Sequence, residues 1–187
     1  GERASEIRER YGKGKKYLFS TVSRLEKEKN YGFLLRGIAE FRHRYGDDFQ
    51  VMILGDGSQK GELKVRASLL GIHDVVTFVG NVPNHEVKDY LAASDVFLFA
   101  SKSETQGIVL AEAMAAGKPV VAVHAVGSDD IIKDGVNGYL TEEDETAWAE
   151  HVKMALEKEK GRKMMRQALR TAENYRSSRL ALYEEML

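Results

Sequence analysis

The chain has 187 residues, with 28 Lys plus Arg against 29 Asp plus Glu and a formal net charge of −1. This length suits one domain with a substantial core, and the balanced charge argues against nucleic acid as a partner. The absence of cysteine excludes disulfides, thiolate nucleophiles and cysteine-bound metals. The five histidines lack the spacing of a zinc peptidase, so we expect them to be surface or structural residues and expect no metal site.

Strand-like apolar runs alternate with segments of helical periodicity along the chain. Strands are predicted over residues 17–22, 49–54, 75–79, 96–100, 119–123 and 139–140. Helices are predicted over residues 30–45, 58–70, 84–92, 107–116, 129–133, 142–158, 162–175 and 178–186. Continuous apolar strands separated by helices indicate a parallel sheet with helices on both faces. The predicted fold is therefore a Rossmann-like α/β domain, whose ligands bind in the loops beyond the carboxyl ends of the strands.

The loop after the first predicted strand carries two cations. Arg24 and Lys29 follow the carboxyl end of the strand and precede a helix. A guanidinium, an ammonium and the amides of a helix N-terminus together suit an anion such as phosphate. The alternative is a solvated charged turn, in which Glu26 and Glu28 neutralise the cations.

The loop after the second predicted strand reads Gly55-Asp56-Gly57-Ser58. It lacks the third glycine of a dinucleotide-binding fingerprint, and the chain has no P-loop motif. We therefore expect a tight turn that requires glycine.

The loop after the fourth predicted strand carries two carboxylates, Glu104 and Glu112, separated by seven residues. A carboxylate accepts hydrogen bonds from the vicinal hydroxyls of a sugar. Backbone N–H groups near Gly107 and Ile108, at the start of a helix, suit phosphate. Sugar, phosphate and ribose follow one another in this order in a nucleotide-sugar. The alternative is a capping box, in which Ser101 and Glu104 serve only to begin the helix.

Taken together, these segments resemble the C-terminal, donor-binding half of GT-B glycosyltransferases, specifically the retaining family four. The run from Ser23 to Lys29 resembles the family's Arg-x4-Lys motif, and Gly55-Asp56-Gly57 resembles its Gly-Asp-Gly turn. Residues 103–122 resemble the family's E-x7-E motif and its continuation. Three shorter segments, 76–80, 93–96 and 134–138, complete the match.

The resemblance implies catalytic roles for three residues, Arg24, Lys29 and Glu104. The two cations would bind the donor's diphosphate and stabilise the leaving nucleotide, while Glu104 would hold the transferred sugar. Glu112 would hold the ribose hydroxyls. The other donor contacts that the resemblance implies, several of them through the backbone, are Ser23, Gly55, Asn81, Val82, Thr105, Gln106, Gly107 and Ile108.

The implied reaction is the transfer of a hexose from a nucleotide-sugar, UDP- or GDP-linked, to a glycan or lipid acceptor. Family members retain the configuration of the sugar and need no metal or other cofactor, because cations of the protein stabilise the leaving group. The expected location is cytoplasmic, with peripheral contact at the inner membrane face in the full-length enzyme.

A whole GT-B enzyme has two Rossmann-like domains, and this chain has one. We expect residues 1–15 to be the remnant of a linker and residues 16–160 to be the nucleotide-sugar-binding domain. Residues 161–187 are expected to be helices that pack on the missing N-terminal domain. We therefore expect this chain alone to bind its donor and to turn over poorly or not at all. The alternatives are a non-catalytic nucleotide-sugar-binding or regulatory module and an epimerase of related fold.

Overall fold

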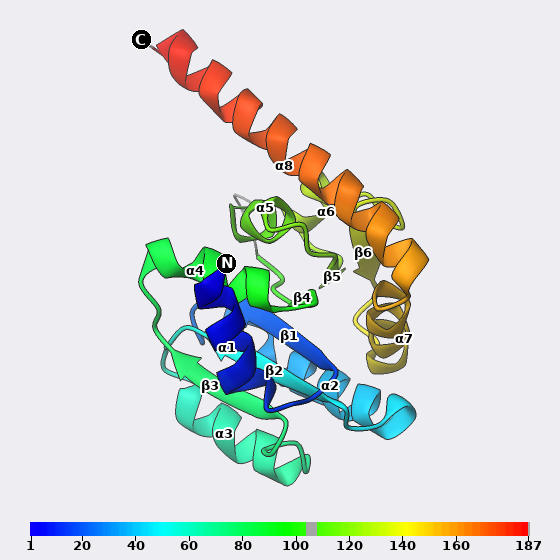
Figure 1. Cartoon of the computed structure of the whole chain (residues 1–187). Helices are drawn as coiled ribbons and strands as arrows, with labels where there is room; N and C mark the ends of the chain where they lie inside the picture. Colours follow the sequence, from blue (N-terminus) through cyan, green and yellow to red (C-terminus); the bar gives the residue numbers. More distant parts are fainter. Residues whose placement is uncertain (104–107, 187) are drawn as a thin grey trace.

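The computed structural model describes residues 1–103 and 108–186, arranged around one sheet (Figure 1). The sheet has six strands in the order β3-β2-β1-β4-β5-β6, and every pair of neighbours is parallel. The strands are β1 Tyr17–Val22, β2 Phe49–Leu54, β3 Val76–Gly80, β4 Val96–Phe99, β5 Val120–Val123 and β6 Gly138–Thr141. The predicted Rossmann-like fold is confirmed, and each strand lies within two residues of its predicted bounds.

Helices cover both faces of the sheet (Figure 1). They are α1 Glu2–Gly12, α2 Tyr31–Tyr45, α3 Lys60–Leu69, α4 Asn84–Ala93, α5 Ile108–Ala115, α6 Ser128–Ile131, α7 Glu145–Ala155 and α8 Lys158–Met186. One core cluster joins the sheet to α2, α3 and α7, and two others join the opposite face to α1, α4, α5 and α8. Because side chains alternate along a strand, each buried strand contributes to both layers.

The C-terminal helices differ from the prediction. Helix α7 begins at Glu145 because the Asp144 carboxylate caps it, accepting the N–H of Ala147 at 2.8 Å. One continuous helix, α8, replaces the two helices expected over 162–175 and 178–186, so the predicted break was wrong. The residues at that break, Arg176 and Ser177, are neither glycine nor proline and do not interrupt a helix.

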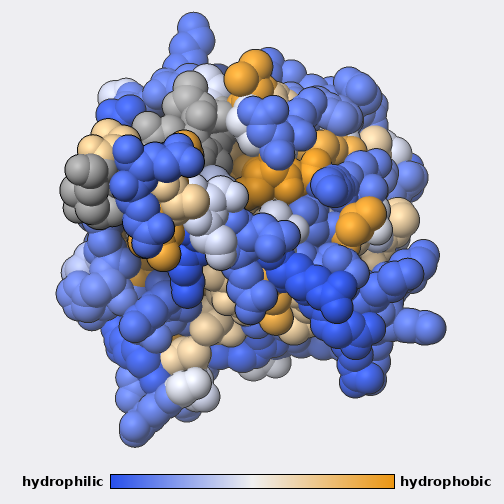
Figure 2. All heavy atoms as spheres, turned by 90° about the horizontal axis from the view of Figure 1, so that it is seen from above, coloured by the Kyte–Doolittle hydropathy of each residue, from blue (hydrophilic) through white to orange (hydrophobic). Residues whose placement is uncertain are grey.

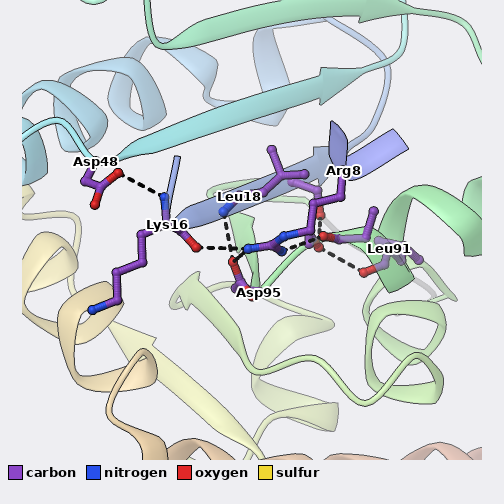
Figure 3. Close-up of polar contacts among 9 residues, drawn as sticks. Arg8, Lys16, Leu18, Asp48, Leu91 and Asp95 are labelled. Carbon is purple, nitrogen blue, oxygen red and sulfur yellow. Dashed lines mark hydrogen bonds and ion pairs between the residues drawn. The ribbon is translucent and has the colours of Figure 1, made fainter. Parts of the chain in front are cut away.

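Helix α1 lies within the segment 1–15 that was expected to be a linker. Its Ile7 side chain is 2% exposed, and its Arg8 guanidinium donates to the backbone oxygens of Ala93 and Lys16, each at 2.9 Å. Arg8 also meets the Asp95 carboxylate at 3.0 Å (Figure 3). Residues 2–12 are therefore packed against the folded body, a feature that the highly charged sequence of this segment concealed.

Asp95 connects this helix to the sheet. The Asp95 carboxylate accepts a hydrogen bond from the backbone N–H of Leu18 at 2.9 Å (Figure 3). The backbone N–H of Asp95 donates to the Leu18 backbone oxygen at 2.7 Å. Beside it, the buried hydroxyls of Ser20 and Ser94 lie 2.8 Å apart. These contacts anchor the amino ends of β1 and β4 and leave the carboxyl ends of the strands to form the site.

Candidate functional site

The loop after β1, residues 23–30, is fixed by its backbone and by buried neighbours. Leu25 is fully buried, and its N–H donates to the Asp56 oxygen at 2.9 Å. The Ser23 hydroxyl lies 2.6 Å from the Tyr31 hydroxyl, while burial raises the Tyr31 pKa to about 12. The loop then passes through a short 3-10 turn, Lys27–Lys29, and enters α2. Its conformation is therefore set before any ligand arrives.

The Gly-Asp-Gly turn after β2 packs directly against this loop. Gly55 has a φ of +126°, and a Cβ there would lie 1.9 Å from the Ser23 backbone oxygen. A Cβ at Gly57 would lie 2.5 Å from the Leu25 oxygen. The predicted requirement for glycine thus has two causes, a positive φ at Gly55 and close backbone approach at both positions.

Glu26 joins the same two loops. Its carboxylate accepts the Ser58 backbone N–H at 3.0 Å and the Ser58 hydroxyl at 2.5 Å. These two hydrogen bonds, with the hydroxyl contributing most, lower the pKa of Glu26. Glu26 is therefore engaged with Ser58, which weakens the alternative in which it serves only to neutralise the cations.

The two predicted cations differ in their surroundings. The Arg24 side chain is 77% exposed, and its Nη2 lies 3.9 Å from a Glu28 carboxylate oxygen. Such an exposed pair contributes little, so Arg24 remains available to an incoming anion. Lys29 is half-buried, and its backbone N–H donates to the Glu26 oxygen at 3.0 Å.

The loops after β1 and β4 meet at the point where the strand order reverses. The Glu28 backbone oxygen accepts the N–H of Lys102 at 3.2 Å, and the Ser101 hydroxyl lies 3.5 Å from it. The Lys102 ammonium lies 2.7 Å from the Glu143 carboxylate. This carboxylate also accepts a hydrogen bond from the Asn30 side-chain amide at 3.1 Å. Both hydrogen bonds lower the pKa of Glu143, and the one from Lys102 contributes more than the one from Asn30. Open α/β sheets bind ligands at this reversal point.

The loop after β3 lies beside the Gly-Asp-Gly turn. The N–H of Gly55 donates to the Gly80 oxygen at 2.8 Å, and Gly80 has a φ of +88°. Asn81 is exposed, whereas Val82 is half-buried and packs against the core beneath α4. The structure therefore brings Ser23, Arg24, Gly55, Asn81 and Val82 to one edge of the sheet.

Four of the predicted contacts, Glu104, Thr105, Gln106 and Gly107, lie outside the described residues, so the capping-box alternative is not tested. The described part of the loop resumes at Ile108, the first residue of α5, whose side chain is 41% exposed. Glu112 lies one turn further on the same exposed face, and partial burial raises its pKa.

A groove of about 330 Å³ runs between the exposed face of α5 and helix α8. Its lining residues come from both helices and are Ile108, Ala111, Glu112, Ala115, Ala172, Tyr175, Arg176 and Arg179. In the view from above, hydrophobic side chains gather in patches within a largely hydrophilic surface (Figure 2). Sequence reasoning missed the two arginines near Glu112 because they lie more than 60 residues further along the chain.

Within residues 1–103 and 108–186, no three His, Asp or Glu side chains gather as a metal site would require. In the same described part of the chain, no helix combines the length and the apolar character needed to cross a bilayer.

An α/β domain with phosphate-suited loops at its strand reversal is typical of nucleotide-binding proteins. Residues 3–172 match the model of the family described as glycosyl transferases group 1. The chain belongs to this family of glycosyltransferases, which confirms the family on which the resemblance rests.

Relatives and solved structures extend this finding. The chain is 36% identical over 141 residues to alpha-monoglucosyldiacylglycerol synthase of Streptococcus pneumoniae, covering 74% of this chain and 32% of that protein. It is 26% identical to Anabaena HepE, solved in complex with UDP-glucose, with a TM-score of 0.85 over 100% of this chain and 53% of that one. It also matches the C-terminal domain of LpcC, a group 1 family protein of Francisella tularensis, at 22% identity. That likeness has a TM-score of 0.80 and covers 92% of this chain and 90% of that one.

The chain spans about a third of the length of the curated relatives it matches, at 36% and 32%.

Proposed function

We propose that this chain is the donor-binding domain of a retaining glycosyltransferase that transfers a hexose from a UDP- or GDP-linked donor to a glycan or lipid acceptor. The observation that carries the proposal is the junction of the loops after β1 and β4. There the Glu28 oxygen and the Lys102 N–H, 3.2 Å apart, hold the exposed Arg24 loop beside the loop that leads into α5.

The diphosphate of the donor would lie at this junction. The Arg24 guanidinium offers a planar fork of N–H groups, which matches phosphate oxygens. As the bond between sugar and phosphate breaks, negative charge grows on the leaving diphosphate, and a nearby cation stabilises that charge. We assign this role to Arg24 and Lys29 and the sugar-holding role to Glu104, with no metal in the site.

The ribose of the donor would lie against α5. Glu112 stands on the exposed face of this helix, where its carboxylate has room to accept two vicinal hydroxyls. Partial burial disfavours its charged form, as the raised pKa records. Hydrogen bonds from the ribose would offset that cost, because they stabilise the carboxylate.

The similar proteins support parts of the donor and acceptor assignment. The HepE structure holds UDP-glucose, which supports a uridine-linked hexose. The Streptococcus relative is named for a product built on diacylglycerol, which supports a lipid acceptor. With a lipid acceptor, we place the whole enzyme in the cytoplasm, at the inner face of the membrane.

Helix α8 belongs to the same proposal. Its C-terminal part projects beyond the rest of the molecule (Figure 1), and Leu180 and Leu182 are 57% and 56% exposed. Apolar side chains on a projecting helix favour a protein partner. We assign this segment, within residues 161–187, to contact with the N-terminal domain of a whole enzyme.

Calorimetric titration of this chain with UDP, GDP, ADP and their sugars tests the proposal. Replacing Arg24 or Glu112 with alanine should weaken nucleotide binding roughly tenfold or more, since each removes a charge-assisted contact. Arg3→Ala is the matched control, because Arg3 is also exposed and pairs with Glu6 on α1, away from the candidate site. The proposal is refuted if the chain binds none of these nucleotides at millimolar concentration, or if neither variant loses affinity.

A further inference from the structure

His124 stands at the carboxyl edge of the sheet and has no role in the site described above. It follows β5 directly, and its backbone N–H donates to the Thr141 oxygen of β6 at 2.9 Å. Its Nδ1 lies 3.2 Å from both carboxylate oxygens of Asp129 in α6. Asp129 is itself held in place, since its Oδ1 accepts the Ala125 N–H at 3.0 Å. The imidazole is therefore oriented by a fixed carboxylate.

This contact determines what the other ring nitrogen can do. An ionised carboxylate only accepts hydrogen bonds, so Nδ1 must carry the proton that joins the two groups. In the neutral ring Nε2 is then an acceptor. The side chain is 45% exposed, and across residues 1–103 and 108–186 no group is hydrogen-bonded to Nε2. With a neutral ring, His124 thus presents an acceptor at the sheet edge.

The alternation of side chains along β5 places Val120 and Ala122 on the face that α5 covers. Val120 and Ala122 pack in the core cluster that contains Leu110 of α5, whereas Val121 packs in the cluster on the opposite face. His124 is the first residue after this strand, at its carboxyl end.

The loop after β5 also lies beside the loop that precedes α5. Ser103 and Val126 form a bridge between these two loops. Helices α5 and α6 pack together beneath them. His124 and the start of α5 therefore lie in the same region of the carboxyl edge.

The strand order gives the distance between His124 and the proposed diphosphate site. In the proposed function the diphosphate lies at the reversal between β1 and β4. Neighbouring strands are about 4.8 Å apart, so β5 stands roughly 10 Å from β1, on the side away from β3. The sugar is bonded to the diphosphate, so a sugar that extends toward β5 comes within reach of His124.

We propose that Nε2 of His124, with the ring held by Asp129, accepts a hydroxyl of the donor's sugar. This inference rests on the proposed function and adds a sugar-selecting residue to it. A hydroxyl can donate to an unprotonated nitrogen, whereas a phosphate oxygen can only accept. The chemistry of the held tautomer therefore favours the sugar over the diphosphate. Asp129 acts as a positioning residue.

Calorimetry on this chain separates sugar contacts from nucleotide contacts. The probes are UDP with UDP-glucose and GDP with GDP-mannose, using whichever pair the wild type binds. His124→Ala should weaken the nucleotide-sugar by roughly threefold to tenfold, as expected for one lost hydrogen bond, and leave the free nucleotide unchanged. His43→Ala, at an exposed histidine of α2, is the matched control.

Asp129→Asn should also weaken the binding of the nucleotide-sugar and leave the binding of the free nucleotide unchanged. Asp130→Asn, at the exposed neighbouring carboxylate, should change neither affinity. A two-bond ¹H–¹⁵N spectrum of the histidine rings provides a readout that folding alone does not move. It should show the Nδ1–H tautomer for His124 in the wild type and its loss in Asp129→Asn. Adding the nucleotide-sugar, but not the nucleotide, should shift the Nε2 signal.

The outcomes separate this inference from the proposal beneath it. If the wild type binds neither nucleotides nor nucleotide-sugars, the proposed function fails and this inference fails with it. If the wild type binds, and His124→Ala weakens nucleotide and nucleotide-sugar equally or neither, the donor-binding function stands and the His124 assignment is overturned.

Discussion

Replacing Gly55 with alanine should damage both stability and nucleotide binding. Gly55 has a φ of +126°, and a Cβ there would meet the Ser23 oxygen at 1.9 Å, well inside van der Waals contact. The obstacle is backbone, which cannot rotate away as a flexible side chain does. The loop after β1 must therefore move.

The magnitude follows from two contributions. Holding an alanine at such a φ costs about 1–3 kcal/mol. Moving the loop also strains two backbone hydrogen bonds, Leu25 N–H to Asp56 and Gln59 N–H to Leu25. At about 1 kcal/mol each, these losses bring the total to roughly 3–5 kcal/mol. At about 2–4 °C per kcal/mol for a chain of this size, the Tm should fall by roughly 10 °C.

Gly46→Ala is the matched control, since Gly46 has a φ of +90° but nothing within 4 Å of its added Cβ. Only the conformational cost of about 1–3 kcal/mol applies there, so the Tm should fall by roughly 2–12 °C, and by less than in Gly55→Ala. Thermal unfolding and nucleotide titration of both variants are the assays. Gly55→Ala should also lose about tenfold in nucleotide affinity because it displaces the Arg24 loop, whereas Gly46→Ala should lose none.

Equal loss of stability in Gly55→Ala and Gly46→Ala, with unchanged nucleotide affinity in both, would refute the reasoning. It would mean that the turn after β2 does not support the loop after β1.

Two further predictions concern the packing of α2 and the link between the loops. Gly37→Ala should cost about 2 kcal/mol or more, because its Cβ would lie 2.5 Å from the Trp148 ring. Gly32→Ala, in the same helix, should be neutral or stabilise by up to about 1 kcal/mol, since an added Cβ there meets the movable ends of two arginine side chains, Arg66 and Arg36. Chemical denaturation measures both variants, and equal effects would contradict the packing argument. Glu26→Gln should destabilise the chain at neutral pH, because Ser58 lowers the carboxyl's pKa below its ordinary 4.5. A carboxyl whose pKa is lower in the folded state stabilises the fold at pH values above its ordinary pKa, and this stabilisation is lost as the pH falls through the folded-state pKa. The difference in Tm between wild type and Glu26→Gln should therefore close below pH 4.5. A Tm difference that does not depend on pH would contradict this prediction.

Much of the architecture was predictable because local patterns dictate it. Strands such as Phe49–Leu54 are continuous apolar runs between turns, and such runs form buried parallel strands whatever surrounds them. Gly55-Asp56-Gly57 marked a turn that requires glycine, and the structure shows why.

Other features were not predictable because they depend on residues far apart in the sequence. Arg8 and Asp95, 87 residues apart, fasten α1 to the sheet, and nothing in the charged N-terminal segment signals this contact. The sequence offered neutralisation of the nearby cations as a role for Glu26, and only the folded structure shows its hydrogen bond with Ser58. His124 was expected to be a surface or structural residue, because a single histidine carries no pattern of its own.

The sequence by itself determined the fold class, the family resemblance and the loops that carry the candidate site. Those properties follow from periodicity, glycine placement and motif order, all of which are local. Only the tertiary structure decided which loops touch, that Glu26 bonds to Ser58 and that Asp129 orients His124. The physical reason is that sheet order and register bring together the ends of strands that lie far apart along the chain.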